Sequence, residues 1–188
     1  YEKIQKELQE KSASPEDYIN KSIEHLLKSI ALPLEFSIDY EYDGTEGYLL
    51  VDLDLPEIED MPQKKIAVLS GGKISIKDKT KKELNEDYVT CVCGLAFFFG
   101  GTLFNISTDI KKILISAYTQ RVNTKTGNQD NEYVYSVVFD RNIFAGLNVE
   151  NIEPLKGFDN FEHVINVTSS GEMKKIEPYT LMDKRNRQ

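Results

Sequence analysis

Apolar residues along the chain change from a helical spacing to a strict alternation just after Pro33. From residue 14 to residue 33 they recur every three or four positions, and Ser14 and Pro15 are typical of a helix start. From Phe36 onward apolar and polar residues alternate, as in a strand with one buried face. The pattern therefore predicts a helix that ends before Pro33, followed by a sheet.

The first alternating segments form an expected hairpin over residues 36–42 and 49–53, with its turn centred on Gly44 and Thr45. This turn sets a register that places Phe36 opposite Leu53, Ile38 opposite Val51, and Tyr40 opposite Leu49. Apolar partners then share one face. The acids occupy the other face: Glu35, Asp39, Glu41, Asp52 and Asp54.

Later segments alternate between strand and helix patterns. Apolar residues on all sides of residues 82–104 predict a buried central helix. Further hairpins are expected over 66–69 with 73–77, over 113–122 with 133–140, and around 163–167, with a long polar connection at 123–132 and a short helix at 141–147. The predicted fold class is α+β, with a mainly antiparallel sheet of several hairpins packed on the central helix.

Length and composition indicate one folded unit. The chain has 188 residues, 40% of them hydrophobic and 29% charged, with no run of apolar residues long enough for a membrane helix. We expect a single domain over residues 14–179, a linker or the end of an upstream helix over residues 1–13, and a polar tail over 180–188. The first residue is Tyr1, which favours a piece of a longer chain.

Charge is unevenly distributed. The net charge of −8 makes a general nucleic-acid binder less favourable. Residues 35–62 contain ten acids and no Lys or Arg, whereas residues 63–82 contain seven Lys and one Asp. One interpretation is that both segments are solvated faces that attract each other weakly.

The alternative interpretation of the acids is a cation site. Asp39, Asp52 and Asp54 offer oxygen ligands of the kind that Mg²⁺ or Mn²⁺ prefers. With Lys64 or Lys65 nearby, they would suit a metal-dependent, nuclease-like phosphodiesterase. The usual spacing of acid and lysine in such enzymes is missing, so no cofactor is predicted outside this alternative.

A second candidate surface lies on the predicted third hairpin. Tyr118, Arg121, Tyr135 and Arg141 combine aromatic area with guanidinium groups, which are enriched at binding hot spots. Their alternation along two strands means that some members pack into the core instead. A single-strand nucleic-acid adaptor would use similar residues, but the basic groove that it needs is not evident.

The sequence gives little support for a disulfide, a Cys or His metal site, or a catalytic serine. Cys91 and Cys93 are too close to form a disulfide and fit buried core thiols, while His25 and His163 have no ligand partners nearby in the sequence. No serine lies in a nucleophile elbow. Without a disulfide framework or a signal peptide in view, a cytoplasmic location is expected.

Three blocks carry a resemblance to a family. They are residues 55–62, the hairpin residues Tyr118 to Gly127, and the segment from Tyr133 to Pro154. Together they resemble an uncharacterised bacterial domain found toward the C-terminal end of longer proteins. The resemblance implies no reaction, cofactor or catalytic residue.

We therefore expect a non-catalytic interaction or regulatory module of a larger bacterial protein. The acidic hairpin or the connection at 123–132 would contact a protein partner, and no membrane partner is expected. The metal-dependent phosphodiesterase is the alternative, so the question of enzymatic activity is open at this point.

Overall fold

A computed structural model describes residues 2–10, 12–122 and 126–180 of the chain. Helices and strands follow one another in this order: α1 (Glu2–Glu10), α2 (Pro15–Ser29), β1 (Ser37–Asp43), β2 (Tyr48–Asp54), the 3-10 turn η1 (Ile58–Asp60), β3 (Lys64–Val68), β4 (Ile74–Asp78), α3 (Lys81–Phe104), β5 (Lys112–Val122), β6 (Gln129–Asp140), α4 (Arg141–Ala145), η2 (Val149–Asn151), α5 (Pro154–Gly157), η3 (Phe158–Asn160) and β7 (Glu162–Ile165).

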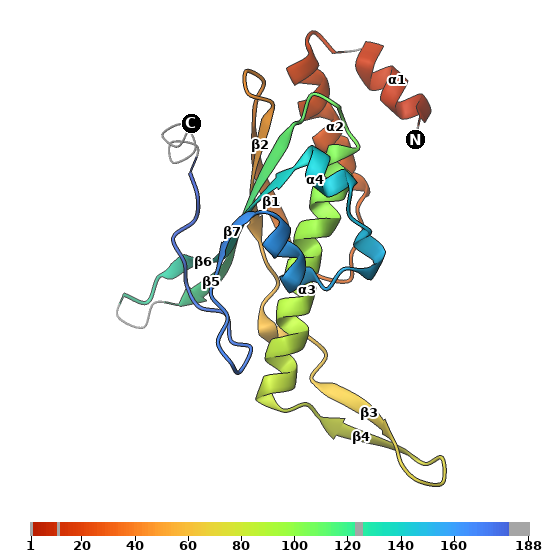
Figure 1. Cartoon of the computed structure of the whole chain (residues 1–188), viewed down its shortest axis with the longest axis vertical. Coiled ribbons are helices and arrows are strands. Elements are labelled where there is room, and N and C mark those ends of the chain that lie inside the picture. Colours follow the sequence, from red (N-terminus) through yellow and green to blue (C-terminus); the bar gives the residue numbers. More distant parts are fainter. Residues whose placement is uncertain (1, 11, 123–125, 181–188) are drawn as a thin grey trace.

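Within the described residues, five strands form one sheet in the order β1-β2-β5-β6-β7, and β3 and β4 form a separate hairpin. Neighbouring strands are antiparallel except β2 and β5, which are parallel. The predicted α+β class with a mainly antiparallel sheet is confirmed, although the sheet is mixed. The parallel pair arises because α3 connects β2 to β5 and returns the chain to the same end of the sheet (Figure 1).

The central helix α3 is buried, as the sequence predicts. A capping box fixes its start: the Thr80 hydroxyl accepts from the Glu83 N–H at 3.3 Å, and the Glu83 carboxylate accepts from the Thr80 N–H at 2.8 Å. α3 is long and apolar enough to cross a membrane by length and composition. However, 61% of its apolar window is buried inside the protein, as in the core helix of a soluble protein.

The two faces of the sheet have different environments. The inner face packs on α3 through Leu49, Val51, Leu53, Ile113, Ile115, Ala117, Tyr135, Val137 and Phe139. α2 covers the β1 end of this face, where the Tyr40 hydroxyl donates to the Asn20 carbonyl at 3.3 Å. Because side chains alternate along strands, Asp39 and Asp52 lie on the outer face.

The predicted register of the first hairpin is wrong by two residues. In the structure Ile38 pairs with Leu53 and Tyr40 with Val51. The reason is the turn, which extends to Gly47, a residue in the left-handed region at φ 68° that glycine tolerates best. A shift of two keeps every side chain on its predicted face, so the separation of acids from apolar residues survives.

The remaining predicted segments are partly matched. β6 begins at Gln129, so the connection at 123–132 is shorter than expected, and its residues 123–125 lie outside the described part. The expected last hairpin is reduced to β7, which pairs with β6, and a single bridge between Val167 and Met173. In the expected polar tail, residues 181–188 also lie outside the described part.

Candidate binding surfaces

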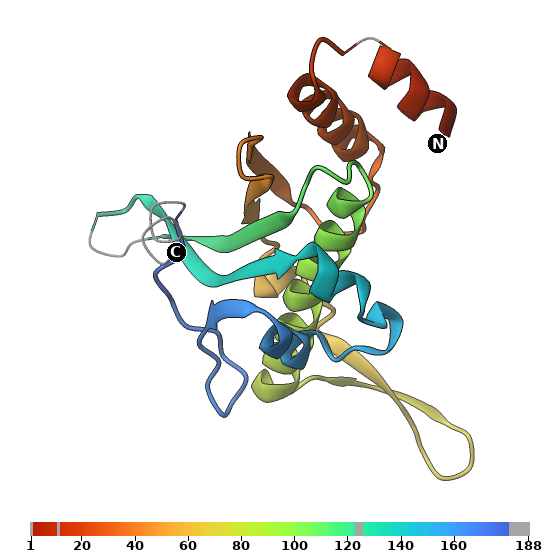
Figure 2. The same cartoon turned by 45° about the horizontal axis from the view of Figure 1, so that its top comes forward.

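The hairpin of β3 and β4 extends away from the rest of the molecule (Figures 1 and 2). We call residues 64–78 the arm. Its register pairs Ile66 with Ile76 and Val68 with Ile74, while Lys65 pairs with Lys77. Since strand side chains alternate, the four β-branched residues share one face of the arm and the two lysines lie on the other.

The aliphatic face of the arm is open to solvent. Ile66 and Val68 are each 73% exposed, Ile74 is 71% exposed and Ile76 is 67% exposed. A sheet normally buries its apolar face, and a two-stranded hairpin alone is only marginally stable in water. Clustered exposed apolar residues mark interaction sites on folded proteins. The aliphatic face of the arm is therefore a candidate binding surface.

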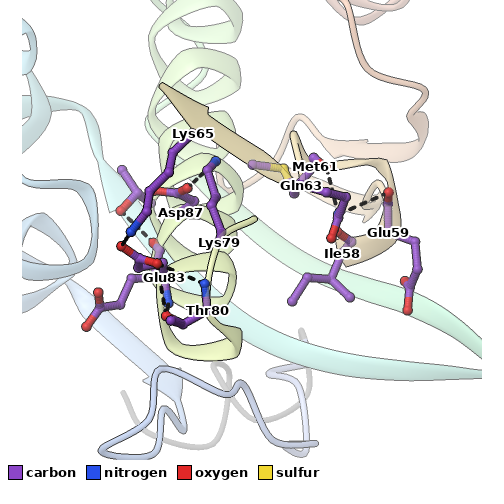
Figure 3. A network of polar contacts seen from close by, with 11 residues as sticks. Ile58, Glu59, Met61, Gln63, Lys65, Lys79, Thr80, Glu83 and Asp87 are labelled. Carbon is purple, nitrogen blue, oxygen red and sulfur yellow. Dashed lines mark hydrogen bonds and ion pairs between the residues drawn. The ribbon is translucent and has the colours of Figure 1, made fainter. Parts of the chain in front are cut away.

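Polar contacts hold the base of the arm to the start of α3 (Figure 3). Lys65 pairs with Glu83, and the Lys79 ammonium lies 2.6 Å from the Asp87 carboxylate. The Lys79 N–H also donates to the Gln63 carbonyl at 2.9 Å. Hydrogen bonds from Lys65 and then Thr80 lower the pKa of Glu83 to about 2, so this carboxylate stays charged at neutral pH. The contacts fix the direction in which the arm points.

The outer face of the five-stranded sheet carries the predicted acids. Asp39 lies opposite Asp52 across the β1–β2 pair. Desolvation raises the pKa of Asp52, and the nearby Asp39 charge adds to this effect, whereas a hydrogen bond from Tyr133 opposes it. Asp54 accepts from the Gln120 amide at 3.0 Å, and desolvation also raises its pKa. The three carboxylates thus share one face but have different partners.

A hollow of about 400 Å³ adjoins Asp39 and Asp52. Acidic, aromatic and aliphatic side chains line it, among them Asp39, Glu41, Leu50, Asp52, Tyr133 and Tyr179. Its chemistry would suit a positively charged group. Among the residues that the structure describes, no group of three or more His, Cys, Asp or Glu side chains is placed to hold a metal ion. The Mg²⁺ or Mn²⁺ alternative therefore stays a prediction from the sequence.

The four predicted binding residues do not form one surface. Tyr118 lies on the outer face, 8% exposed, with its ring 5.5 Å from that of Tyr133. Tyr135 lies on the inner face, fully buried, where its hydroxyl donates to the Val92 carbonyl at 3.0 Å. The side chain of Arg121 lies outside the described part of the chain.

Arg141 acts at the end of the central helix. Its guanidinium donates to the Phe104 carbonyl at 2.9 Å and the Ile110 carbonyl at 2.6 Å, and also to the Ser107 carbonyl. These carbonyls belong to the last residue of α3 and the loop that follows. A cation at this position also complements the negative end of the helix dipole. In this structure Arg141 therefore serves the fold.

Sequence reasoning missed the aliphatic face of the arm. The segments 66–69 and 73–77 are predicted to form a hairpin, and the structure confirms it as β3 and β4. The prediction does not say what the aliphatic face packs against, because periodicity carries no information on distant segments. The signal available was the exceptional density of lysines around Ile66, Val68, Ile74 and Ile76.

No protein family, curated protein or solved structure matches the chain in comparisons of its sequence and fold. The function has to be argued from the surfaces themselves.

Proposed function

We propose that this chain is a non-catalytic protein-interaction module that binds an acidic, amphipathic strand of its partner through the arm. The single observation that carries the proposal is the aliphatic face of Ile66, Val68, Ile74 and Ile76, which is exposed on a hairpin anchored by ion pairs. Burying such a face against a partner releases water from apolar surface and gives a favourable free energy.

The charge of the arm favours an acidic partner. The arm carries four lysines and one aspartate, a net charge of +3, in a chain whose total is −8. Lys73 and Lys77 form no ion pair within the described part of the chain, so their charges face solvent. Complementary charge steers association and selects among partners. A partner that carries carboxylates beside an apolar stripe would satisfy both faces of the arm.

The geometry of the arm favours a strand as the bound element. β3 and β4 pair only with each other in the described sheets, so each has an outer edge of backbone donors and acceptors. An extended segment that adds to such an edge gains main-chain hydrogen bonds, while its alternate side chains give specificity. The resemblance to a bacterial domain in longer proteins would make the arm a docking element of a larger bacterial protein in the cytoplasm.

A peptide titration tests the proposal. The probe is a fluorescent synthetic peptide with the sequence FSIDYEYD, in which apolar residues alternate with one serine and three acids, and the control peptide carries lysine in place of each acid. The wild-type chain should bind the acidic peptide in a saturable way. The double variant Ile66→Thr and Ile76→Thr keeps strand-forming residues and should weaken binding about tenfold or more.

The matched control is Ile143→Thr, an exposed aliphatic residue on α4 far from the arm in the sequence, which should leave affinity unchanged. Circular dichroism checks that each variant is folded. Equal binding of the acidic and lysine peptides, or wild-type affinity in the arm variant, would contradict the proposed function.

A further inference from the structure

We infer that the acidic strand recognised by the arm is β1 of a second copy of this chain. The inference rests on the proposed function and names the partner of the same surface. Four observations support it: the position of β1 at a sheet edge, the match between the faces of β1 and of the arm, the apolar strip of α2 beside that edge, and the direction of the arm.

β1 is the first strand of the five-stranded sheet and pairs only with β2 in the described residues. Its other edge is therefore available for strand addition. Natural sheets usually protect long edges with lysine, proline or bulges. The edge strand here is seven residues long, and two of its three exposed side chains, Asp39 and Glu41, are acidic, which disfavours pairing with a second acidic edge. A basic strand would be accepted.

The two faces of β1 complement the two faces of the arm. On the outer face Asp39 and Glu41 are exposed, and on the inner face Ile38 and Tyr40 are half-buried. Strand addition places the arm's lysine face beside the acids and its aliphatic face beside Ile38 and Tyr40. A slip by one residue would put lysine against the apolar side, so charge and burial select the same registers.

An apolar strip beside the edge provides further cover for the aliphatic face. Leu26 and Leu27 of α2 are partly buried and pack against the core, as do Ile38 and Tyr40. α2 runs next to β1 on the inner side of the sheet. An added strand would therefore extend the inner face of the sheet toward a helix that already contacts it.

The arm of the same molecule points elsewhere. Both views show it directed away from the sheet that contains β1 (Figures 1 and 2), and the Lys65–Glu83 and Lys79–Asp87 pairs fix its base on α3. The contact is therefore between molecules. Because the arm and the edge are different patches, repeated docking would build a ring or a filament, unless two molecules exchange arms and close a dimer.

Sedimentation velocity on the whole chain tests the inference through a charge exchange. Variant one carries Asp39→Lys and Glu41→Lys, and variant two carries Lys73→Glu and Lys77→Glu, all at exposed positions. Wild type should associate in a concentration-dependent way. Each variant alone should associate at least about tenfold more weakly, since like charges then face each other.

Mixing the two variants should restore association, because the acidic arm of variant two then meets the basic edge of variant one. Their remaining arm and edge keep the wild-type charges and also fit each other. A variant that simply misfolds gives no restoration, so the mixture separates a lost contact from a lost fold.

Other outcomes would overturn the inference. A wild-type chain that binds the FSIDYEYD peptide but stays monomeric above the peptide's dissociation constant would retain the proposed function and reject β1 of a second copy. Absence of both peptide binding and association would reject both. Binding to phosphatidylglycerol vesicles that needs Ile66 and Ile76 but is indifferent to variant one would assign the arm to a lipid surface instead.

Discussion

At the residue scale, the acids on the outer face of the sheet share that face but have different hydrogen-bond partners. Asp39 and Asp52 face each other across two strands, and partial desolvation raises the pKa of Asp52 although the residue is exposed. Tyr133 donates a hydrogen bond to the Asp52 carboxylate, and the Gln120 amide donates one to the Asp54 carboxylate. The carboxylates are therefore held by neutral donors rather than by basic side chains, which keeps this face negatively charged.

Replacing Asp52 with Asn should stabilise the protein at pH 7. The folded pKa of Asp52 lies above its usual 3.8, so the charged form is disfavoured in the fold, and stability is lost as pH rises through the folded pKa. Asn stays neutral and can still accept from Tyr133. Urea unfolding should show a gain of about 0.5 kcal/mol after allowance for solvent screening.

The gain should vanish below pH 3.8, where both side chains are neutral. Glu59→Gln, at an exposed acid outside the strands, controls for the change in net charge. A destabilised Asp52→Asn variant at neutral pH would mean that the carboxylate makes contacts that a neutral amide cannot replace.

Glu83 shifts in the opposite direction. Its pKa lies at about 2 because Lys65 and Thr80 donate to the carboxylate, so its contribution is present above the usual 4.5 and is lost as pH falls through about 2. In the variant Lys65→Met, an NMR titration should find the pKa of Glu83 moved up toward 4.5. An unchanged titration would show that the Lys65 contact does not hold the arm.

At the element scale, the sequence predicts element types better than their connections. The first hairpins follow from periodicity, because burial of one face imposes a period on the residues themselves. The central helix follows instead from apolar residues on all of its sides. The register error of the first hairpin comes from Gly47, whose role in the turn local pattern does not distinguish from that of Gly44. The parallel pairing of β2 with β5 depends on the path of α3, which no local pattern records.

The candidate sites follow the same division. Faces are predictable, so Asp39, Asp52 and Asp54 were correctly expected on a common side. The tertiary neighbours of a residue are not predictable from the local pattern. The sequence therefore groups Tyr135 and Arg141 with Tyr118, although Tyr135 lies in the core and Arg141 lies at the end of α3. The open face of the arm was missed because exposure depends on the absence of a covering element.

Substituting two glycines of α3 should have opposite effects. A Cβ at Gly100 would lie 2.9 Å from the Phe139 ring, so Gly100→Ala should destabilise the protein by about 1–3 kcal/mol. A Cβ at Gly94 finds only Pro154, at 3.9 Å, so Gly94→Ala should stabilise the helix by about 0.5–1 kcal/mol. Thermal unfolding of both variants measures this, and equal shifts would contradict the close packing of α3 on β6.

At the scale of the whole molecule, the main feature is the separation of charge. Residues 35–62 carry −10 and residues 63–82 carry +6, and the acidic strands and the arm lie in different parts of the fold (Figure 1). Side-chain pairs at the arm base use only some of the lysines. The molecule thus presents two complementary surfaces that the arm's direction keeps from meeting within one chain.

Binding by the arm should weaken as salt is added. The Debye length falls from about 10 Å at 0.1 M salt to about 3 Å at 1 M, which screens the attraction between exposed charges. The affinity for the acidic peptide should fall over this range, while a residual affinity from the aliphatic face persists. Affinity that rises with salt would mean that apolar burial alone drives binding and that the lysines take no part.

An NMR titration shows directly whether the arm is the docking element. Acidic FSIDYEYD peptide is added to the ¹⁵N-labelled chain, and shift changes are mapped onto the sequence. Docking on the arm should concentrate the changes in residues 64–78, with those of Ile66, Val68, Ile74 and Ile76 among the largest. Changes centred instead on the outer sheet face around Tyr133 and Tyr179, or none at saturating peptide, would contradict it.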